Sequence, residues 1–295
     1  MSAREPTATD AERGPTVDGP ITIEERAAVD EALRVGTLTV VGRIVDASNV
    51  ALLVDVGDGP GGLAPMRAIY KPVKGERPLW DFPEGTLAGR EVASALVAEA
   101  TGYAVVPPTV LRDGPLGVGS VQQWIGDPFA AEAHDGPVRV VPAGRVPEGW
   151  LSVVDGQLPD GTDVTVIHED SANLRDAAVL DAILNNSDRK GSHLVRDSRG
   201  TLWGFDHGLT FHAEPKLRTV LWGWAGQPLR ESDIDRLALL AERLGDPQQP
   251  LTRALAELLP PGDLTALEAR VQRLAVGGIH PGPGGRWPSI PWPAI

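Results

Sequence analysis

Two short stretches of the sequence decide the fold: Asn185–Val195 reads NNSDRKGSHLV, and Leu202–Leu209 reads LWGFDHGL. Asp188 lies in the first stretch and Asp206 in the second. The polar residues Asp197–Gly200 between them suit the turn of a β-hairpin. The pattern predicts an acidic loop residue, then a strand, a tight turn and a second strand that ends at Asp206. Phosphoryl transfer needs such a pair of carboxylates, because one accepts the proton of the acceptor hydroxyl and the other holds a metal ion on the phosphates.

Composition limits the class of protein. The chain has 295 residues and 42% hydrophobic content, enough for one large domain or two lobes with a hydrophobic core. Its net charge of −13 disfavours nucleic acids and anionic lipids as partners. No apolar stretch approaches the ~20 residues that a membrane-spanning helix requires. The absence of cysteine excludes disulfides and thiolate chemistry, and the N-terminus lacks a signal-like apolar segment, so we expect a cytoplasmic protein.

The N-terminal half of the chain has the element order of a kinase N-lobe. We expect residues 1–20 to be a disordered tail and residues 21–125 to be a nucleotide-binding N-lobe. Periodicity, turn residues and helix stops predict the elements of this lobe. They are a helix at 23–34, strands at 36–45, 50–56 and 66–70, a helix at 86–101, and strands at 109–112 and 119–125.

The C-terminal half is mainly helical by pattern. We expect helices at 171–184, 231–244, 251–259 and 264–276. Residues 127–165 are rich in proline and glycine without clear periodicity, and we interpret them as an insertion or the start of the second lobe. We expect residues 126–280 to form a catalytic and metal-binding C-lobe, and residues 281–295 to form a Pro/Trp-rich C-terminal tail.

Lys71 closes the third predicted strand, because Pro72 cannot donate a hydrogen bond to a sheet. In a nucleotide phosphotransferase, a lysine at this place contacts the phosphates and a glutamate from a helix holds it. Glu91 lies twenty residues further on, at the edge of the buried stripe of its predicted helix. We therefore expect a Lys71–Glu91 ion pair; the alternative is that both side chains are solvated surface residues.

The turn between the first two strands is a second candidate contact with phosphate. The backbone N–H groups near Ser48 and Asn49, and the Ser48 hydroxyl, are suited to donate hydrogen bonds to an anion. The alternative is an ordinary turn, which Ser-Asn also favours.

Asp206 follows an apolar strand directly, where a buried charge costs free energy unless a cation compensates it. Mg²⁺ held by one or two carboxylates and by phosphate oxygens would supply that cation. The alternative for Asp188 is that it is an ordinary aspartate of a polar turn. The spacing of His193, His207 and His212 matches no standard zinc pattern.

These motifs, in this order, resemble those of the phosphatidylinositol 3-/4-kinase superfamily, particularly its bacterial, type II 4-kinase-like and HipA-like members. More narrowly, the chain resembles an uncharacterised actinobacterial kinase-like family. The similar segments are AIYKP (68–72), GREVA (89–93), VVPPT (105–109), GSVQQWI (119–125), NSDR (186–189) and FDHGL (205–209). The resemblance covers roughly residues 36–211.

The resemblance and the element order both indicate a two-lobed α+β protein-kinase-like fold with a β-rich N-lobe and a mainly helical C-lobe. The resemblance implies that Lys71 binds the phosphates of ATP, that Glu91 orients Lys71 and that Asp206 is the Mg²⁺ ligand. It further implies that Asp188 is the catalytic base. The residues expected to border adenine are Gln123, Trp124 and Ile125.

His193 departs from the family pattern. Five residues after the catalytic aspartate the family usually has an asparagine that holds a metal, whereas this chain has His193. Imidazole is a poor ligand for Mg²⁺ and suits Mn²⁺ better. Either the second metal is lost, the metal differs, or catalysis is impaired.

The leading hypothesis is an ATP-dependent phosphotransferase that acts on a protein hydroxyl or a small soluble molecule, with Mg²⁺ or Mn²⁺. One alternative is a pseudokinase that serves as a nucleotide-binding or scaffold module; another is an AMP transferase on the same fold. The presence of both aspartates and of the lysine–glutamate pair favours the first hypothesis over the pseudokinase. The sequence does not separate phosphate transfer from AMP transfer, and it encodes neither the acceptor nor the oligomeric state.

Overall fold

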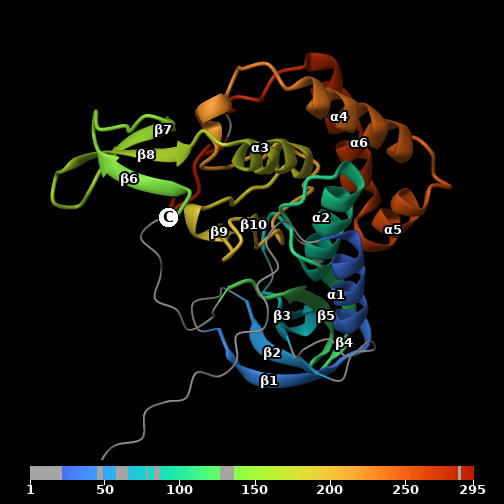
Figure 1. The fold of residues 1–295 in the computed structure, drawn as a ribbon. Helices are drawn as coiled ribbons and strands as arrows, with labels where there is room; N and C mark the ends of the chain where they lie inside the picture. Colours follow the sequence, from blue (N-terminus) through green and yellow to red (C-terminus); the bar gives the residue numbers. More distant parts are fainter. Residues whose placement is uncertain are drawn as a thin grey trace, which may run out of the picture.

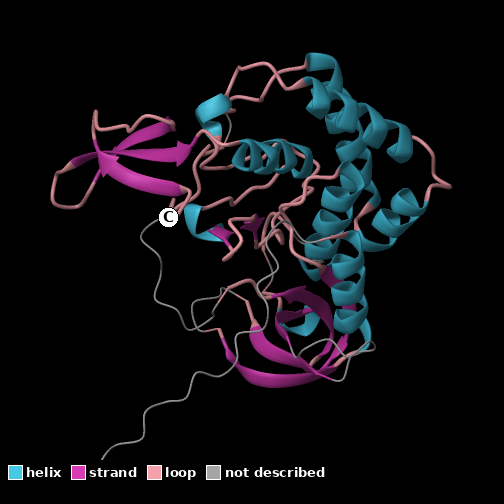
Figure 2. Cartoon of the chain, viewed as in Figure 1, coloured by secondary structure: helices cyan, strands magenta, loops and turns pink. Residues whose placement is uncertain are grey.

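The computed structural model describes residues 22–44, 49–57, 66–77, 79–82, 87–126, 136–284 and 287–295 (Figure 1). The predicted N-terminal tail and Ser48 lie outside these residues. A β-rich N-lobe and a mainly helical C-lobe follow one another along the chain, as Figure 2 shows by colour. The predicted α+β fold class is therefore confirmed.

The N-lobe is built on a five-stranded antiparallel sheet. Its strands are β1 (Thr37–Arg43), β2 (Leu52–Gly57), β3 (Met66–Pro72), β4 (Thr109–Gly114) and β5 (Gly117–Gln123), in the order β1-β2-β3-β5-β4. Val54, Tyr70 and Val121 are fully buried in the core of this lobe. The Tyr70 hydroxyl donates a hydrogen bond of 2.6 Å to the carbonyl of Gly117, so its polar end is satisfied. Lys71 thereby follows a firmly anchored residue of β3.

Two helices accompany the sheet. Helix α1 (Ile23–Val35) begins at Thr22, whose side chain accepts a hydrogen bond from the backbone of Glu25, while the Glu25 carboxylate accepts one from Thr22 N–H. Helix α2 (Leu87–Thr101) is buried on nearly all sides, because it packs against β4 and β5 and against two C-lobe helices. A Cβ added at Gly89 would lie 2.9 Å from the carbonyl oxygen of Leu258, so a glycine permits this close helix approach.

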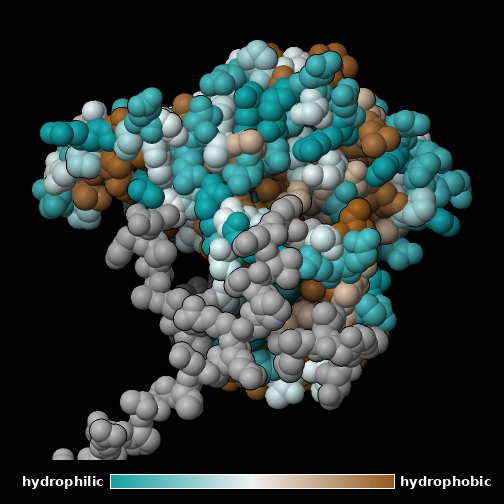
Figure 3. Space-filling view, in the orientation of Figure 1, coloured by the Kyte–Doolittle hydropathy of each residue, from teal (hydrophilic) through white to brown (hydrophobic). Residues whose placement is uncertain are grey.

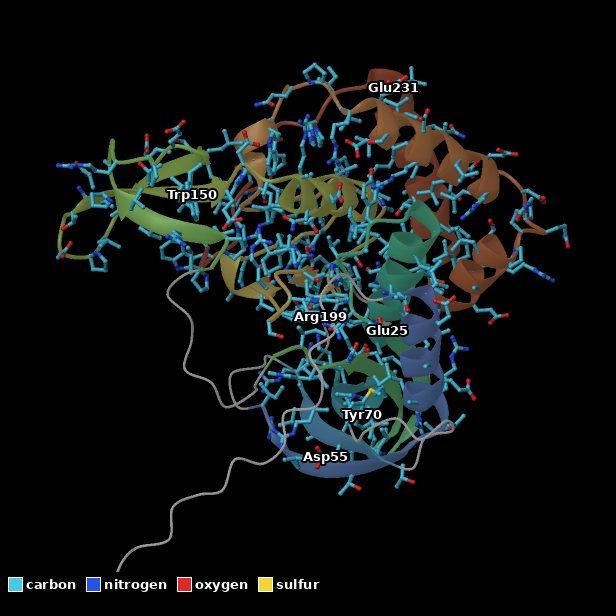
Figure 4. The ribbon with its side chains drawn as sticks, viewed as in Figure 1. Glu25, Asp55, Tyr70, Trp150, Arg199 and Glu231 are labelled. Atoms are coloured by element: carbon cyan, nitrogen blue, oxygen red, sulfur yellow. The ribbon has the colours of Figure 1, made fainter. Side chains whose placement is uncertain are left out.

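The C-lobe surrounds one large hydrophobic core. Its helices are α3 (Ala172–Leu184), α4 (Glu231–Leu244), α5 (Pro250–Leu258) and α6 (Pro261–Gly277), and its short hairpin is formed by β9 (Leu194–Arg196) and β10 (Leu202–Gly204). The described residues also form short 3₁₀ helices: η1 (Val73–Gly75) follows β3 in the N-lobe, and η2 (Gly191–His193) and η3 (Trp222–Trp224) lie in the C-lobe. Leu174, Ile183, Leu237 and Leu267 are fully buried in this core. In Figure 4, Tyr70 marks the N-lobe sheet, and Glu231 marks the start of α4 at the opposite end of the molecule.

A separate three-stranded sheet projects from the C-lobe (Figure 1). It consists of β6 (Val138–Pro142), β7 (Trp150–Gln157) and β8 (Asp163–Glu169), in the order β6-β8-β7. No regular pattern was found in this part of the sequence. The structure supplies a reason for β7: most of this strand is exposed, so little alternation between buried and exposed positions is required. In Figure 3 hydrophilic and hydrophobic residues mix on the visible face of this sheet.

None of the helices in the described part of the chain is long and apolar enough to cross a membrane.

Candidate active site

Four side chains from distant parts of the chain meet between the two lobes. Lys71, at the end of β3, donates hydrogen bonds to Glu91 Oε1 on α2 and to Asp206 Oδ1, the latter at 2.9 Å. His193 in η2 places its Nε2 atom 3.6 Å from Asp206 Oδ2. The strand end, the helix and the loop after β10 thus converge on one ammonium group. The Lys71–Glu91 pair predicted from the sequence is present in the structure.

The two carboxylates that hold Lys71 have different surroundings. The side chain of Glu91 is 3% exposed, whereas that of Asp206 is 53% exposed. Burial disfavours the charge of Lys71, but Asp206 and Glu91 outweigh this effect and raise the pKa of Lys71. The charge of Lys71 in turn lowers the pKa of Asp206. Asp206 is therefore an ionised carboxylate with an open side, which is the form that binds a divalent cation.

The backbone around Asp206 is held in an uncommon conformation. Asp206 has φ 57°, in the left-handed region that few residues other than glycine adopt. The next residue fixes this geometry, because the backbone N–H of His207 donates to Glu91 Oε2 at 2.9 Å. Glu91 thus contacts Lys71 with one oxygen and the Asp206 segment with the other.

His207 connects this segment to the loop that carries Asp188. Arg189 donates to His207 Nε2 at 2.7 Å and to the carbonyl of Phe205 at 2.8 Å. Since Nε2 accepts from a guanidinium, the ring is neutral, and burial lowers the pKa of His207. Arg189 itself forms a buried bidentate ion pair with Asp181 of α3.

The end of α3 shapes the loop of residues 185–191, which we call the catalytic loop because the sequence predicts that Asp188 is the catalytic base. The helix stops at Asn185, which has φ 53° and donates its side-chain amide to the carbonyls of His212 and Glu214. Asn186 donates to Asp181 at 2.9 Å and accepts from the backbone N–H of Asp188 at 3.0 Å. Hydrogen bonds on both sides therefore fix the backbone that presents Asp188.

The Asp188 carboxylate is partly buried beside a lysine. Its side chain is 23% exposed, and Lys190 Nζ lies 3.1 Å from Oδ2. Burial raises the pKa of Asp188, the ion pair with Lys190 opposes this shift, and the charge of Asp206 adds to it. A carboxylate with a raised pKa is a better proton acceptor, as a general base requires.

The segment expected to border adenine leaves β5 at the junction of the lobes. The backbone N–H of Gln123 donates to the carbonyl of Pro108, and that of Trp124 donates to the carbonyl of Arg67, both at 2.9 Å. Gln123 Oε1 and Trp124 Nε1 are buried and have no hydrogen-bond partner among the described residues. An acceptor and a donor without partners fit a heteroaromatic base, which offers both kinds of group at its edge.

Asn49 does not join the cluster. Its side-chain oxygen accepts a hydrogen bond of 2.9 Å from the backbone N–H of Arg77. Ser48 lies outside the described residues, so the phosphate contact expected from this turn stays a prediction.

The donor set for a metal is small. Asp206 and His193 supply a carboxylate and an imidazole, and the described residues contain no group of three or more histidine, aspartate or glutamate side chains that could hold a metal ion. Mg²⁺ is commonly bound by one or two carboxylates together with substrate phosphates. The residues therefore fit a metal that binds with a nucleotide.

The Asp181–Arg189 link was not identified from the sequence. Its signal was present, because Asp181 interrupts the apolar run AAVLDAIL of residues 177–184. A charge inside the buried stripe of a helix requires a buried partner. The sequence does not say which of the many arginines that partner is.

The fold is similar to solved protein kinases. The structure of the Golgi casein kinase aligns with a TM-score of 0.51 and 14% identity, covering 86% of this chain and 74% of that one. The Golgi casein kinase with Mn/ADP bound aligns equally well, at 15% identity over 86% of this chain and 75% of that one. The protein therefore has a kinase-like fold.

A relative at the sequence level comes from Mycobacterium tuberculosis (strain ATCC 25618 / H37Rv). Protein Rv2133c is 45% identical over 265 residues, which cover 88% of this chain and 93% of that protein. The chain belongs to the same family as Rv2133c. No protein-family model matches the sequence, so the narrower resemblance to phosphatidylinositol 3-/4-kinases and HipA-like proteins stays a prediction.

Proposed function

We propose that the protein is an ATP-dependent phosphotransferase that uses a divalent metal ion. The observation that carries the proposal is the contact of Lys71 with both Glu91 and Asp206, because phosphoryl transfer in kinases uses a lysine paired with a helix glutamate and a metal-binding aspartate at the same nucleotide phosphates.

The roles follow from exposure and charge. Lys71 binds phosphate oxygens, and the buried Glu91 keeps its ammonium in place. The exposed side of Asp206 binds the metal, with His193 as a second donor beside it. When bound, the metal would neutralise negative charge on the phosphates. Gln123, Trp124 and Ile125 border the adenine.

Asp188 accepts the proton of the acceptor hydroxyl as the γ-phosphoryl group of ATP is transferred to that oxygen and ADP leaves. The ammonium of Lys190, 3.1 Å from Asp188, lies where it also stabilises negative charge that develops on the acceptor side. The acceptor is a protein hydroxyl or a small soluble molecule, and the chain's net charge of −13 disfavours an anionic membrane surface. The Golgi casein kinase structure with Mn/ADP supports nucleotide and metal use on this fold.

The test follows the label from γ-labelled and α-labelled ATP in the presence of Mg²⁺ or Mn²⁺. Wild-type protein should transfer the γ label to itself or to an acceptor supplied in an extract fraction. Lys71→Met, Asp188→Asn and Asp206→Asn should each reduce transfer by roughly 100-fold or more. Lys74→Met, which removes an exposed lysine three residues away, serves as the matched control and should transfer label like the wild type.

Two results would contradict the proposal. Transfer of the α label would identify an AMP transferase. Nucleotide binding without transfer of either label, in both metals, would identify a pseudokinase.

A further inference from the structure

The C-terminal residues of the chain lie beside the catalytic loop. The backbone N–H of Gly191 donates to the carbonyl of Ala294 at 2.8 Å, and Gly191 is three residues after Asp188. Figure 1 shows the C-terminus next to β9, far from the end of α6. We call residues 287–295 the C-terminal strap.

The strap also holds a segment that pairs with the catalytic loop. The backbone N–H of Arg189 donates to the backbone carbonyl of Arg218 at 3.0 Å, and that of Val220 donates to the backbone carbonyl of Arg189 at 3.2 Å. On the other side, the backbone N–H of Thr219 donates to the backbone carbonyl of Ser289 in the strap at 3.1 Å. Residues 218–220 are thus bonded to the catalytic loop on one side and to the strap on the other.

There is little room for the loop to shift at Gly191. A Cβ at this position would lie 3.1 Å from Cβ of Val138 on β6 and 3.6 Å from the carbonyl oxygen of Ala294. The strap and the projecting sheet therefore confine Gly191 between them.

A tryptophan anchors the beginning of the strap to a buried lysine. The rings of Trp287 and Trp80 stack with centroids 5.8 Å apart. Lys216 Nζ lies 4.6 Å from the Trp287 ring centroid and 5.0 Å from that of Trp80. The Lys216 side chain is only 4% exposed, and its ion pair with Asp81 is long, at 3.4 Å. The two indole rings therefore contribute, together with the Asp81 carboxylate, to stabilising a buried ammonium.

Lys216 is tied to the catalytic loop by its backbone. Its N–H donates to Asn185 Oδ1 at 2.9 Å, and Asn185 is the first residue of that loop. Trp80 belongs to the connector between β3 and α2, close in sequence to Lys71. Trp287 therefore contacts, through Trp80 and Lys216, both a connector of the N-lobe and the segment after Asp206.

From these contacts we infer that the C-terminal strap positions the catalytic loop for phosphoryl transfer, and that Trp287 is the positioning residue that anchors it. The inference rests on the proposed function. Within the described residues the hydrogen bonds of the strap fall on Gly191, Arg218, Thr219 and Trp222, and not on Lys71, Glu91 or Asp206. Loss of the strap contact should therefore impair the acceptor side of the site and spare nucleotide binding.

The experiment compares Trp287→Ala with Trp287→Phe and with Trp292→Ala. Trp292 lies in the same strap but is 86% exposed, so it is a matched control of the same residue type. Trp287→Ala should lower kcat by about 10- to 100-fold, because a small misplacement of a catalytic group has an effect of this size. KM for ATP should change by less than about twofold, since the phosphate-binding groups are untouched. Trp287→Phe keeps an aromatic face for Lys216 and should recover most of the rate.

Amide hydrogen exchange provides a readout that does not depend on activity. The amides of Gly191 and Thr219 donate to strap carbonyls, so they should exchange at least about tenfold faster in Trp287→Ala. The amide of Gly204, which donates to Val105, should be unchanged. A chain that ends at residue 286 should show the same pattern more strongly, and the point variants decide the matter if that shortened chain does not fold.

Three results would overturn the inference. Exchange at Gly191 and Thr219 in Trp287→Ala could equal that in Trp292→Ala. ATP affinity and kcat could fall together with the melting temperature, which is the mark of a general structural role. Trp287→Phe could be as impaired as Trp287→Ala. If the wild type transfers no phosphate, the proposed function fails, and the exchange rates still show whether the strap holds the loop.

Discussion

Lys71 is the residue on which the proposed chemistry depends most directly. It is held by one buried and one exposed carboxylate, and these carboxylates come from different lobes. Lys71→Met should weaken ATP binding by at least about tenfold, because a charge-assisted contact with phosphate is lost. It should also lower the free energy of unfolding by roughly 1–3 kcal/mol, because Glu91 remains buried without its cation.

Calorimetric titration with ATP and urea denaturation measure the two effects. Adding Glu91→Gln to Lys71→Met should restore much of the stability but none of the binding. Binding at the wild-type level in Lys71→Met would show that the lysine does not contact the phosphates.

His193 is the residue at which this chain departs from the pattern it resembles. Its Nε2 atom lies 3.6 Å from Asp206 Oδ2, and an imidazole favours Mn²⁺ over Mg²⁺. His193→Asn offers an oxygen ligand instead and should shift the preference for metal toward Mg²⁺. The affinity of a fluorescent ATP analogue, titrated with each metal, checks this independently of turnover. An unchanged ratio of the two affinities would mean that His193 does not contact the metal.

At the scale of elements, one buried ion pair joins α3 to the catalytic loop. The side chains of Asp181 and Arg189 are 1% and 2% exposed, and Arg189 also binds His207 and the Phe205 carbonyl. Asp181→Leu or Arg189→Met alone should cost about 3–5 kcal/mol, because each leaves an unpaired buried charge.

The double variant, Asp181→Leu with Arg189→Met, should recover a large part of that loss. Urea denaturation of the four proteins gives the coupling free energy directly. Additive single effects would show that the pair is not coupled. Turnover should stay low in the double variant, since the link from α3 to His207 is absent.

The elements that the sequence predicted well are those with a local signal. Helix α1 has a capping box at Thr22, and α3 ends at the left-handed Asn185. Helix α6 begins earlier than expected, at Pro261, because proline is favoured in the first turn of a helix although it resembles a break in the pattern. The projecting sheet β6–β8 was not recognised, since β7 is mostly exposed and β8 has four consecutive buried residues, so neither strand alternates regularly.

Within the site, a residue could be predicted where a motif surrounded it. Lys71, Glu91 and Asp206 lie in three such motifs, and the structure brings their side chains together. The buried charge of Asp181 indicated a partner, but the sequence did not say that the partner is Arg189. The contacts of Trp287 with Trp80 and Lys216 could not be predicted, because no motif surrounds any of the three residues. Such pairings are set by packing, which no single stretch encodes.

At the scale of the whole molecule, a histidine cluster joins the projecting sheet to the end of α6. His168 of β8 and His280 flank Trp224, with ring centroids 4.4 Å and 6.2 Å from it. His168 Nε2 accepts from the backbone N–H of Gly223 at 3.0 Å, and His280 Nε2 accepts from Arg175 Nε at 3.0 Å. Both rings must be neutral to accept these hydrogen bonds.

Burial lowers the pKa of His168, and burial and Arg175 lower the pKa of His280 to about 4. An unfolded histidine has a pKa of about 6.5, so the unfolded chain binds more protons below that pH. The stabilisation from these rings is therefore complete above pH ~6.5 and decreases as the pH falls toward 4. The other charged groups around the cluster are Asp170, Glu169, Arg230 and Asp233.

We predict that the free energy of unfolding decreases between pH 6.5 and pH 4, and that His168→Gln with His280→Gln makes this decrease shallower. Glutamine keeps an acceptor for Gly223 or Arg175 and does not titrate. Urea denaturation at several pH values, followed by tryptophan fluorescence, measures the slope. His193 and His207 remain in both proteins, so the difference between the two profiles reports only the substituted rings. Parallel profiles would show that the cluster does not set the acid sensitivity of the fold, and that the junction between the projecting sheet and α6 tolerates charged rings.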